Sequence, residues 1–158
     1  MRNVFIFALL ILLTVGLIWG NSLKTIEQSA DQSAPVAESL QPVLDPQEKM
    51  EKPEFHDFVR KLAHVTEFFV LGLFTAGFAV SLGTYLKKSF ISMPILMTLV
   101  VAVGDEYIQH FAGRGSLVTD VVLDFASALA GLGVAWAFLW VFRRVTRRRK
   151  SRKEQYNG

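Results

Sequence analysis

Four long apolar runs, separated by polar stretches, limit what this chain can fold into. They are Val4–Trp19, Phe58–Leu82, Phe90–Phe111 and Leu117–Phe142. The last three are long enough to cross a hydrocarbon core of about 30 Å as helices that rise about 1.5 Å per residue. Apolar residues make up 51% of the 158 residues, and their concentration in long blocks is typical of membrane proteins. The pattern predicts an all-α polytopic membrane protein with four transmembrane helices.

The first apolar run has two interpretations. Arg2 before it and Asn21-Ser22 after it suit a cleaved secretory signal peptide. Trp19 suits the interfacial end of a retained anchor, and no small-x-small cleavage site follows at once. We favour the retained anchor.

Composition divides the chain into three parts. We predict an N-terminal anchor with an acidic extracytoplasmic linker over residues 1–57, a three-helix membrane domain over 58–142, and a basic cytoplasmic tail over 143–158. The polar segment Ser22–Glu54 holds four prolines and many Gln, Ser and Glu residues, which predicts a loop or a loosely helical linker. Part of it is expected to lie along the membrane surface.

Positive charge sets the expected orientation. Lys87, Lys88 and the Lys/Arg-rich tail should stay in the cytoplasm, so both termini are predicted to be cytoplasmic. The acidic linker and the turn Ala112–Ser116 then face outside. The expected location is the cytoplasmic membrane of a bacterium, and the expected partners are membrane lipids and not nucleic acid. A homo-oligomer is compatible with the sequence. The absence of cysteine excludes disulfides, thiolate metal sites and a cysteine nucleophile.

Polar side chains at one end of three spans are the main functional clue. They are Lys61, His64, Glu67, Asp105, Glu106, Gln109, Arg114, Asp120 and Asp124. Each ionisable group costs about 2.5–3.5 kcal/mol at the centre of a membrane helix, so such groups are rare there unless they have a function. The acids and His64 fall within roughly 5–14 Å of the outer boundary on all three helices. This matching depth predicts a polar cleft that opens to the outer leaflet.

Each of these residues also has a plain structural explanation when it is taken singly. Lys61 and Arg114 suit cations that extend to the membrane interface, and His64 suits a neutral histidine hydrogen-bonded within the bundle. The number of carboxylates argues for a function, because five acids face two firm cations, or three if Arg60 is included. An apolar setting will not hold that surplus ionised, so some acids must bind protons or a cation must enter.

The residue types suggest roles. His64, Glu67, Asp105 and Glu106 form a candidate catalytic acid/base cluster. The candidate substrate-binding residues are Lys61, Gln109, Arg114, Asp120 and Asp124. No metal site and no cofactor is predicted, because the spacing fits no standard metal motif. A divalent cation is the less favoured alternative, since the cluster offers oxygen ligands and one imidazole.

Three motifs resemble those of the VanZ-like family of bacterial membrane proteins. The stretch from Lys61 to Gly72 resembles the family's K-x-x-H-x-x-E-[FY] opening, and Gly104 to Phe111 resembles its D-E-x-x-Q-x-F signature. Gly113-Arg114 followed by Asp120 resembles its G-R-x5-D element. Two departures stand out. Ala112 replaces a usual proline, and Asp124 replaces a common asparagine.

The resemblance implies a four-helix membrane protein of the cell envelope, in a family named after a protein associated with teicoplanin resistance. It implies no reaction. The sequence therefore leaves three functions open. The first is recognition of a lipid-linked envelope component or a lipoglycopeptide antibiotic. The second is an intramembrane enzyme that acts on a lipid head group by acid/base chemistry. The third is a proton-coupled transporter, which would need to oligomerise.

Overall fold

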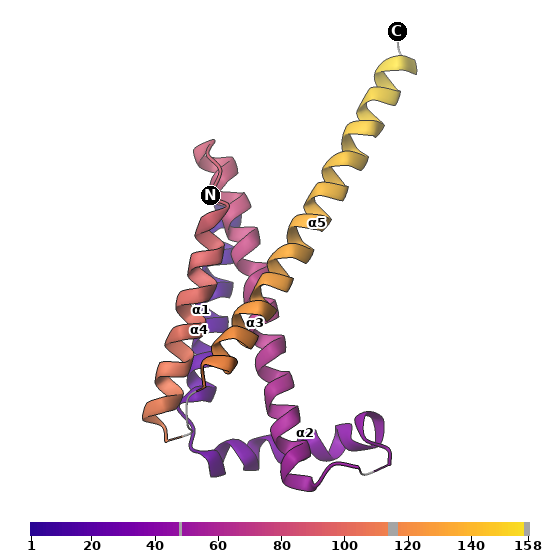
Figure 1. Ribbon diagram of the computed structural model, residues 1–158. Coiled ribbons are helices and arrows are strands. Elements are labelled where there is room, and N and C mark those ends of the chain that lie inside the picture. The colour runs from indigo at the N-terminus through magenta and orange to yellow at the C-terminus, as the bar shows by residue number, and fades with distance from the viewer. Residues whose placement is uncertain (48, 114–116, 157–158) are drawn as a thin grey trace.

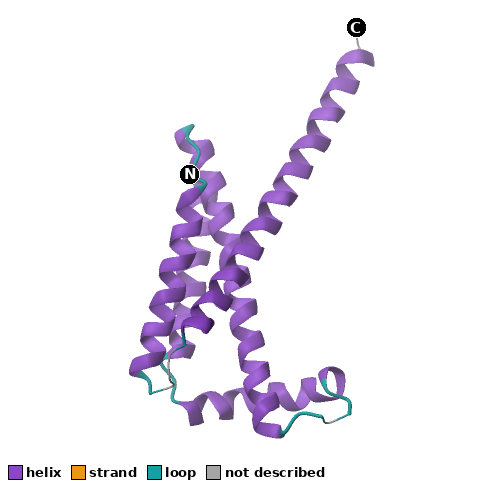
Figure 2. Cartoon of the chain, viewed as in Figure 1, coloured by secondary structure: helices purple, strands orange, loops and turns teal. Residues whose placement is uncertain are grey.

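The chain is all-helical in the computed structural model, which describes residues 1–47, 49–113 and 117–156, without the side chains of 143 and 147–156. Its helices are α1 (Arg2–Ser22), α2 (Ile26–Leu44), α3 (Lys52–Leu86), α4 (Ser92–Phe111) and α5 (Val118–Tyr156). The described residues contain no strand (Figure 2). The all-α prediction is therefore confirmed, and each of the four predicted apolar runs lies in a helix apart from Phe90, Ile91 and Leu117.

Helix α3 is the centre of the fold. It packs against α1, α2, α4 and α5, and α4 also packs against α1 and α5. Figure 1 shows α2 lying across one end of this bundle, close to the connection between α4 and α5. The N-terminus and the α3–α4 connection lie at the opposite end, and α5 extends away from the bundle on that side (Figure 1).

Among the described residues, three helices are long and apolar enough to cross a membrane: Arg2–Ser22, Lys52–Leu86 and Val118–Thr146. Helix α4 is not among them, and the polar residues Asp105, Glu106 and Gln109 near its end lower its mean hydropathy. It nevertheless belongs to the same bundle as the other three. The fourth membrane span remains a prediction.

Small residues allow α3 and α5 to approach each other closely. A Cβ atom at Gly72 would collide with the backbone carbonyl of Ala128, and one at Gly131 would collide with the carbonyl of Phe69. Glycine at both positions lets the two backbones touch, as small residues do in other membrane helix pairs. The contact is next to the polar residues of α3 and α5, so it sets how these side chains face each other.

Helix α2 differs from the predicted loop or loosely helical linker. It is a 19-residue helix that begins with a capping box, in which Thr25 Oγ1 accepts from the Gln28 backbone N–H and Gln28 Oε1 accepts from the Thr25 N–H. Ala37 of α2 is buried in a small cluster with Phe55 and Val59 of α3. This tertiary contact supplies stability that the weak helix propensity of the segment cannot provide.

The connection from α2 to α3 is held by Asp45. Its carboxylate accepts hydrogen bonds from the backbone N–H groups of Lys49 at 3.0 Å and Met50 at 2.9 Å. Because these donors favour the ionised form, with Met50 the larger contribution, they hold the pKa of Asp45 below its ordinary value. This turn leads the chain from α2 back into the bundle.

Candidate functional site

Asp105 lies at the centre of a buried polar cluster. Its side chain is completely inaccessible to solvent, although it is ionisable. Ser22 Oγ of α1 donates to Asp105 Oδ1 at 2.6 Å, and Gln109 Nε2 donates to Asp105 Oδ2 at 2.7 Å. His64 Nδ1 of α3 lies 3.8 Å from Asp105 Oδ2. Side chains from α1, α3 and α4 therefore meet at this one carboxylate.

A second carboxylate, Glu67, flanks the same histidine. Asn21 Nδ2 of α1 donates to Glu67 Oε1 at 2.9 Å. The other oxygen, Oε2, lies 4.0 Å from His64 Nδ1, one turn away on α3. The His64 Nδ1 atom is buried and has no hydrogen-bond partner among the described residues. It therefore faces two carboxylates, each slightly beyond hydrogen-bond distance.

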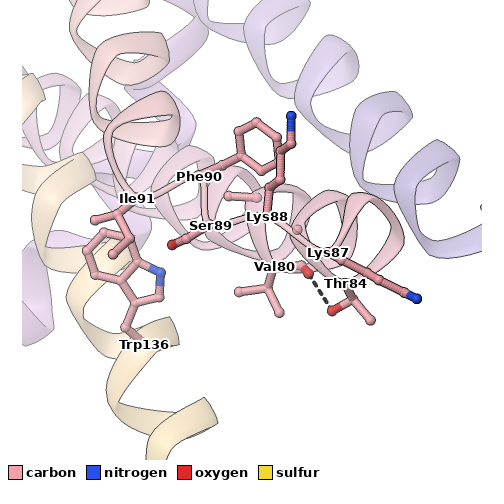
Figure 3. A pocket seen from close by; sticks show the side chains of 10 residues that line it. Val80, Thr84, Lys87, Lys88, Ser89, Phe90, Ile91 and Trp136 are labelled. Atoms are coloured by element: carbon pink, nitrogen blue, oxygen red, sulfur yellow. Dashed lines mark hydrogen bonds between the residues drawn. The ribbon is translucent and has the colours of Figure 1, made fainter.

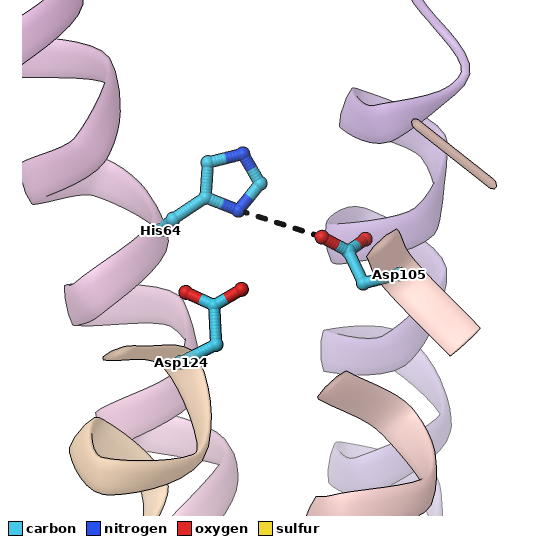
Figure 4. A group of neighbouring side chains, drawn as sticks. All are labelled: His64, Asp105 and Asp124. Carbon is cyan, nitrogen blue, oxygen red and sulfur yellow. Dashed lines mark ion pairs between the residues drawn. The ribbon is translucent and has the colours of Figure 1, made fainter. Parts of the chain in front are cut away.

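Helix α5 brings a third acid, Asp124, to the cluster. It is only 4% exposed, and it makes no hydrogen bond to a described residue. One ligand atom from each of His64, Asp105 and Asp124 lies within 4.8 Å of the other two. Figure 4 shows the Asp124 carboxylate directed toward the space between His64 and Asp105.

Glu106 has a different position from its neighbour Asp105. It is 6% exposed, and its Oε1 accepts a hydrogen bond from the backbone N–H of Leu117 at 2.6 Å. Leu117 comes directly before α5, so this bond ties the end of α4 to the start of α5. This hydrogen bond therefore helps to position the start of α5, the helix that contains Asp120 and Asp124.

Two cavities meet at this cluster. The smaller, of about 80 Å³, is lined by Arg60, Lys61, His64, Gln109, Asp120, Leu123 and Asp124. The larger, of about 220 Å³, lies under α2 and is lined by Asn21, Ser29, Gln32, Ser33, Val36, Val59, Arg60, Ala63, His64 and Glu67. Arg60 and His64 line both cavities, so they separate two polar spaces.

Most of the predicted site residues converge, and two additional ones contribute. The structure brings together Lys61, His64, Glu67, Asp105, Gln109, Asp120 and Asp124, while Arg114 lies outside the described residues. Asn21 and Ser22 were not predicted as site residues. Their place just after the first apolar run could have indicated them, because it puts two polar side chains at the end of α1 that reaches the cluster. Arg60 is held by an ion pair of 2.9 Å with Asp57.

A third cavity lies at the other end of the bundle, where α3 connects to α4. It has a volume of about 500 Å³, and its lining includes Lys87, Lys88 and Trp136. Figure 3 shows that the two lysine side chains point in different directions, so their ammonium groups do not converge on one ligand group. The acidic cluster is therefore the better candidate for a specific site.

The fold and the cluster define an α-helical membrane protein with a buried polar site at one end of its bundle. The chain matches the sequence model of the VanZ/LLP1 family over residues 5–142. It belongs to this family, which confirms the resemblance drawn from the three motifs. The search of curated proteins and the search of solved structures gave no significant match.

Proposed function

We propose that this VanZ/LLP1-family membrane protein binds the polar head group of a cell-envelope lipid in the cavity under α2. The observation that carries the proposal is the shared wall between the two cavities. His64 and Arg60 line both, so a group bound under α2 would lie next to the buried acids. Amide and hydroxyl groups of Asn21, Ser29 and Gln32 offer hydrogen bonds to sugar hydroxyls or to phosphate.

The size of the cavity favours a head group over a whole antibiotic. Pockets that enclose drug-sized ligands have volumes of about 300–1,000 Å³. The cavity under α2 has about 220 Å³, which suits one head group or one sugar and not the core of a lipoglycopeptide. Exposed apolar side chains of α2, among them Ile26, Val36 and Val43, suit contact with the lipid surface next to such a ligand.

Filling this cavity should abolish binding without disturbing the acids. Ala63 lines the cavity, while its neighbour Leu62 is 39% exposed and lies outside the lining. We expect Ala63→Trp to weaken binding of a short-chain polyprenyl phosphate at least about tenfold, or 1.4 kcal/mol, with Leu62→Trp as the matched control. Native mass spectrometry of the purified protein, with increasing lipid, measures both. Unchanged binding by Ala63→Trp, or equal loss in both variants, would contradict the proposal.

Acid/base catalysis on the bound head group is the second candidate. The specific observation that favours it is His64 Nδ1, which lies 3.8 Å from Asp105 Oδ2 and 4.0 Å from Glu67 Oε2. An imidazole between two carboxylates is able to accept and release a proton near the larger cavity. Turnover of a radiolabelled polyprenyl phosphate or diphosphate by the wild type and not by His64→Ala would favour this candidate. Binding without turnover would favour recognition alone.

We further infer that the protein lies in the cytoplasmic membrane of a bacterium with both termini in the cytoplasm. The connection between α3 and α4, which contains Lys87 and Lys88, lies at the same end of the bundle as the N-terminus (Figure 1), in agreement with the rule that positive loops stay inside. Helix α2 and the acidic cluster lie at the opposite end, which would then face outward.

Single-cysteine labelling tests this orientation cleanly, because the chain has no native cysteine. Glu27 of α2 and Lys88 are both exposed. In spheroplasts, a membrane-impermeant maleimide should label Glu27→Cys and leave Lys88→Cys unlabelled until the membrane is permeabilised. Labelling of Lys88→Cys in intact spheroplasts would overturn the orientation.

A further inference from the structure

We propose that His64, Asp105 and Asp124 bind a divalent first-row transition-metal ion such as Zn²⁺ or Mn²⁺. The three residues come from three helices, α3, α4 and α5, and their ligand atoms lie within 4.8 Å of one another. This inference does not depend on head-group binding, because Asp105 and Asp124 do not line the cavity under α2, although His64 lines both cavities.

The spacing requires only a small adjustment. Zn–N and Zn–O bonds of about 2.0–2.1 Å place two ligand atoms of a tetrahedral site about 3.4 Å apart. The widest pair in the cluster, at up to 4.8 Å, would have to close by about 1.4 Å, which rotation of a carboxylate side chain can supply. An imidazole with two carboxylates is a ligand set used by transition metals.

Two of the three ligands have no hydrogen-bond partner among the described residues for the atoms that would bind the ion. Asp124 is 4% exposed, lines the 80 Å³ cavity, and makes no hydrogen bond to a described residue. The Nδ1 atom of His64 is buried without a hydrogen-bond partner in the described part of the chain. Burying polar atoms without partners is costly, and a metal ion between them would remove this cost.

The third ligand is held in position by other side chains. Ser22 Oγ and Gln109 Nε2 each donate to one oxygen of Asp105, at 2.6 and 2.7 Å. Hydrogen bonds of this kind orient a carboxylate for metal binding. These hydrogen bonds from α1 and α4 hold the Asp105 carboxylate in one orientation, whether or not an ion is bound.

Charge supports the same conclusion. The carboxyl groups of Glu67, Glu106 and Asp120 lie near the proposed ligands, so each further ionised acid would raise the electrostatic cost of this site. Of the described cations that line the smaller cavity, Arg60 pairs with Asp57, and Lys61 is exposed. A divalent ion would offset two of the negative charges in the setting where they cost most.

Manganese binding to the purified full-length protein tests the inference directly. Electron paramagnetic resonance with added MnCl₂ should show one saturable site, with nitrogen coupling from His64 in pulsed spectra. Zn²⁺ should displace Mn²⁺ more effectively than Mg²⁺, because imidazole ligation favours transition metals over Mg²⁺. We expect Asp124→Asn to weaken Mn²⁺ binding by about 100-fold or more, beyond the 10–100-fold typical of residues that only support ligands.

Asp120→Asn is the matched control, since Asp120 lies one turn from Asp124 on α5 and lines the same cavity. It should weaken Mn²⁺ binding clearly less than Asp124→Asn does, because it removes a nearby charge and no ligand. His64→Gln should remove the nitrogen coupling, and size-exclusion profiles show whether each variant is folded. Absence of a saturable site, equal losses in Asp120→Asn and Asp124→Asn, or nitrogen coupling retained in His64→Gln would overturn the proposal.

Discussion

Gly131→Ala should lower the free energy of unfolding by about 3 kcal/mol, the upper end of the usual cost of overpacking. The added Cβ would collide with the backbone carbonyl of Phe69, which cannot move without shifting α3. A flexible side chain could turn aside, whereas here the two helices must separate. The measurement is unfolding of the purified protein in mixed micelles with increasing SDS, followed by circular dichroism.

Gly133→Ala provides the control for this prediction. Gly133 lies two residues further along α5, and a Cβ there would meet nothing within 4 Å. Replacing an open helical glycine by alanine should stabilise the helix by about 0.5–1 kcal/mol. If both variants had the same stability as the wild type, the close contact between α3 and α5 would not exist in the folded protein.

Gly131→Ala should also change the geometry of the polar cluster. Asp124 lies on α5 seven residues before Gly131, and His64 lies on α3, so the distance between them depends on how closely these two helices pack. If α5 moves away from α3, we expect Gly131→Ala to lose Mn²⁺ affinity even though it alters none of the three proposed ligands. Gly133→Ala should bind the ion as the wild type does.

Ser22→Ala is expected to cost about 2 kcal/mol of folding stability. Ser22 Oγ donates to the buried carboxylate of Asp105, and hydrogen bonds to charged groups contribute about 1.5–3 kcal/mol. Ser22 itself is completely buried, so water cannot replace the lost donor. A double-mutant cycle with Asp105→Ala should give a coupling energy of similar size, because each single change removes the same bond.

Ser127→Ala is the matched control for the serine. Ser127 is also buried, at 8% exposure, but its hydroxyl donates to the Leu123 carbonyl of its own helix. Loss of such a local bond leaves the i→i−4 backbone bond of that carbonyl in place, so the expected cost is below about 1 kcal/mol. A coupling energy near zero between Ser22 and Asp105 in the same SDS titration would contradict the tie between α1 and α4.

Local pattern predicted much of the fold. Each of the four apolar runs forms a helix, although α3 begins at Lys52, six residues before the predicted start, and α4 and α5 begin one or two residues after theirs. Amphipathic α2 was predicted only as a loop or loose helix, because Pro35 and Pro42 and its polar composition disfavour a helix when the segment is considered alone. Its contact with Phe55 and Val59 of α3 could not be read from local propensity.

Several residues of the polar cluster were predicted from the sequence, whereas their pairings and the parts played by Asn21 and Ser22 were not. His64, Glu67, Asp105 and Asp124 were identified because charge is costly inside a membrane helix. The rotation of α4 about its axis decides these pairings. Gln109 donates a hydrogen bond to Asp105, and the Leu117 backbone donates one to Glu106. The contributions of Asn21 and Ser22 required knowledge of where α1 packs.

The sequence by itself determined that this chain forms apolar helices with polar groups near one end of three of them. A fixed rise per residue converts positions along the chain into depth, so no tertiary information was needed. Only the tertiary structure decided which acids face His64. That choice depends on the rotation and closeness of neighbouring helices, which are set where Gly72 and Gly131 bring the backbones of α3 and α5 into contact.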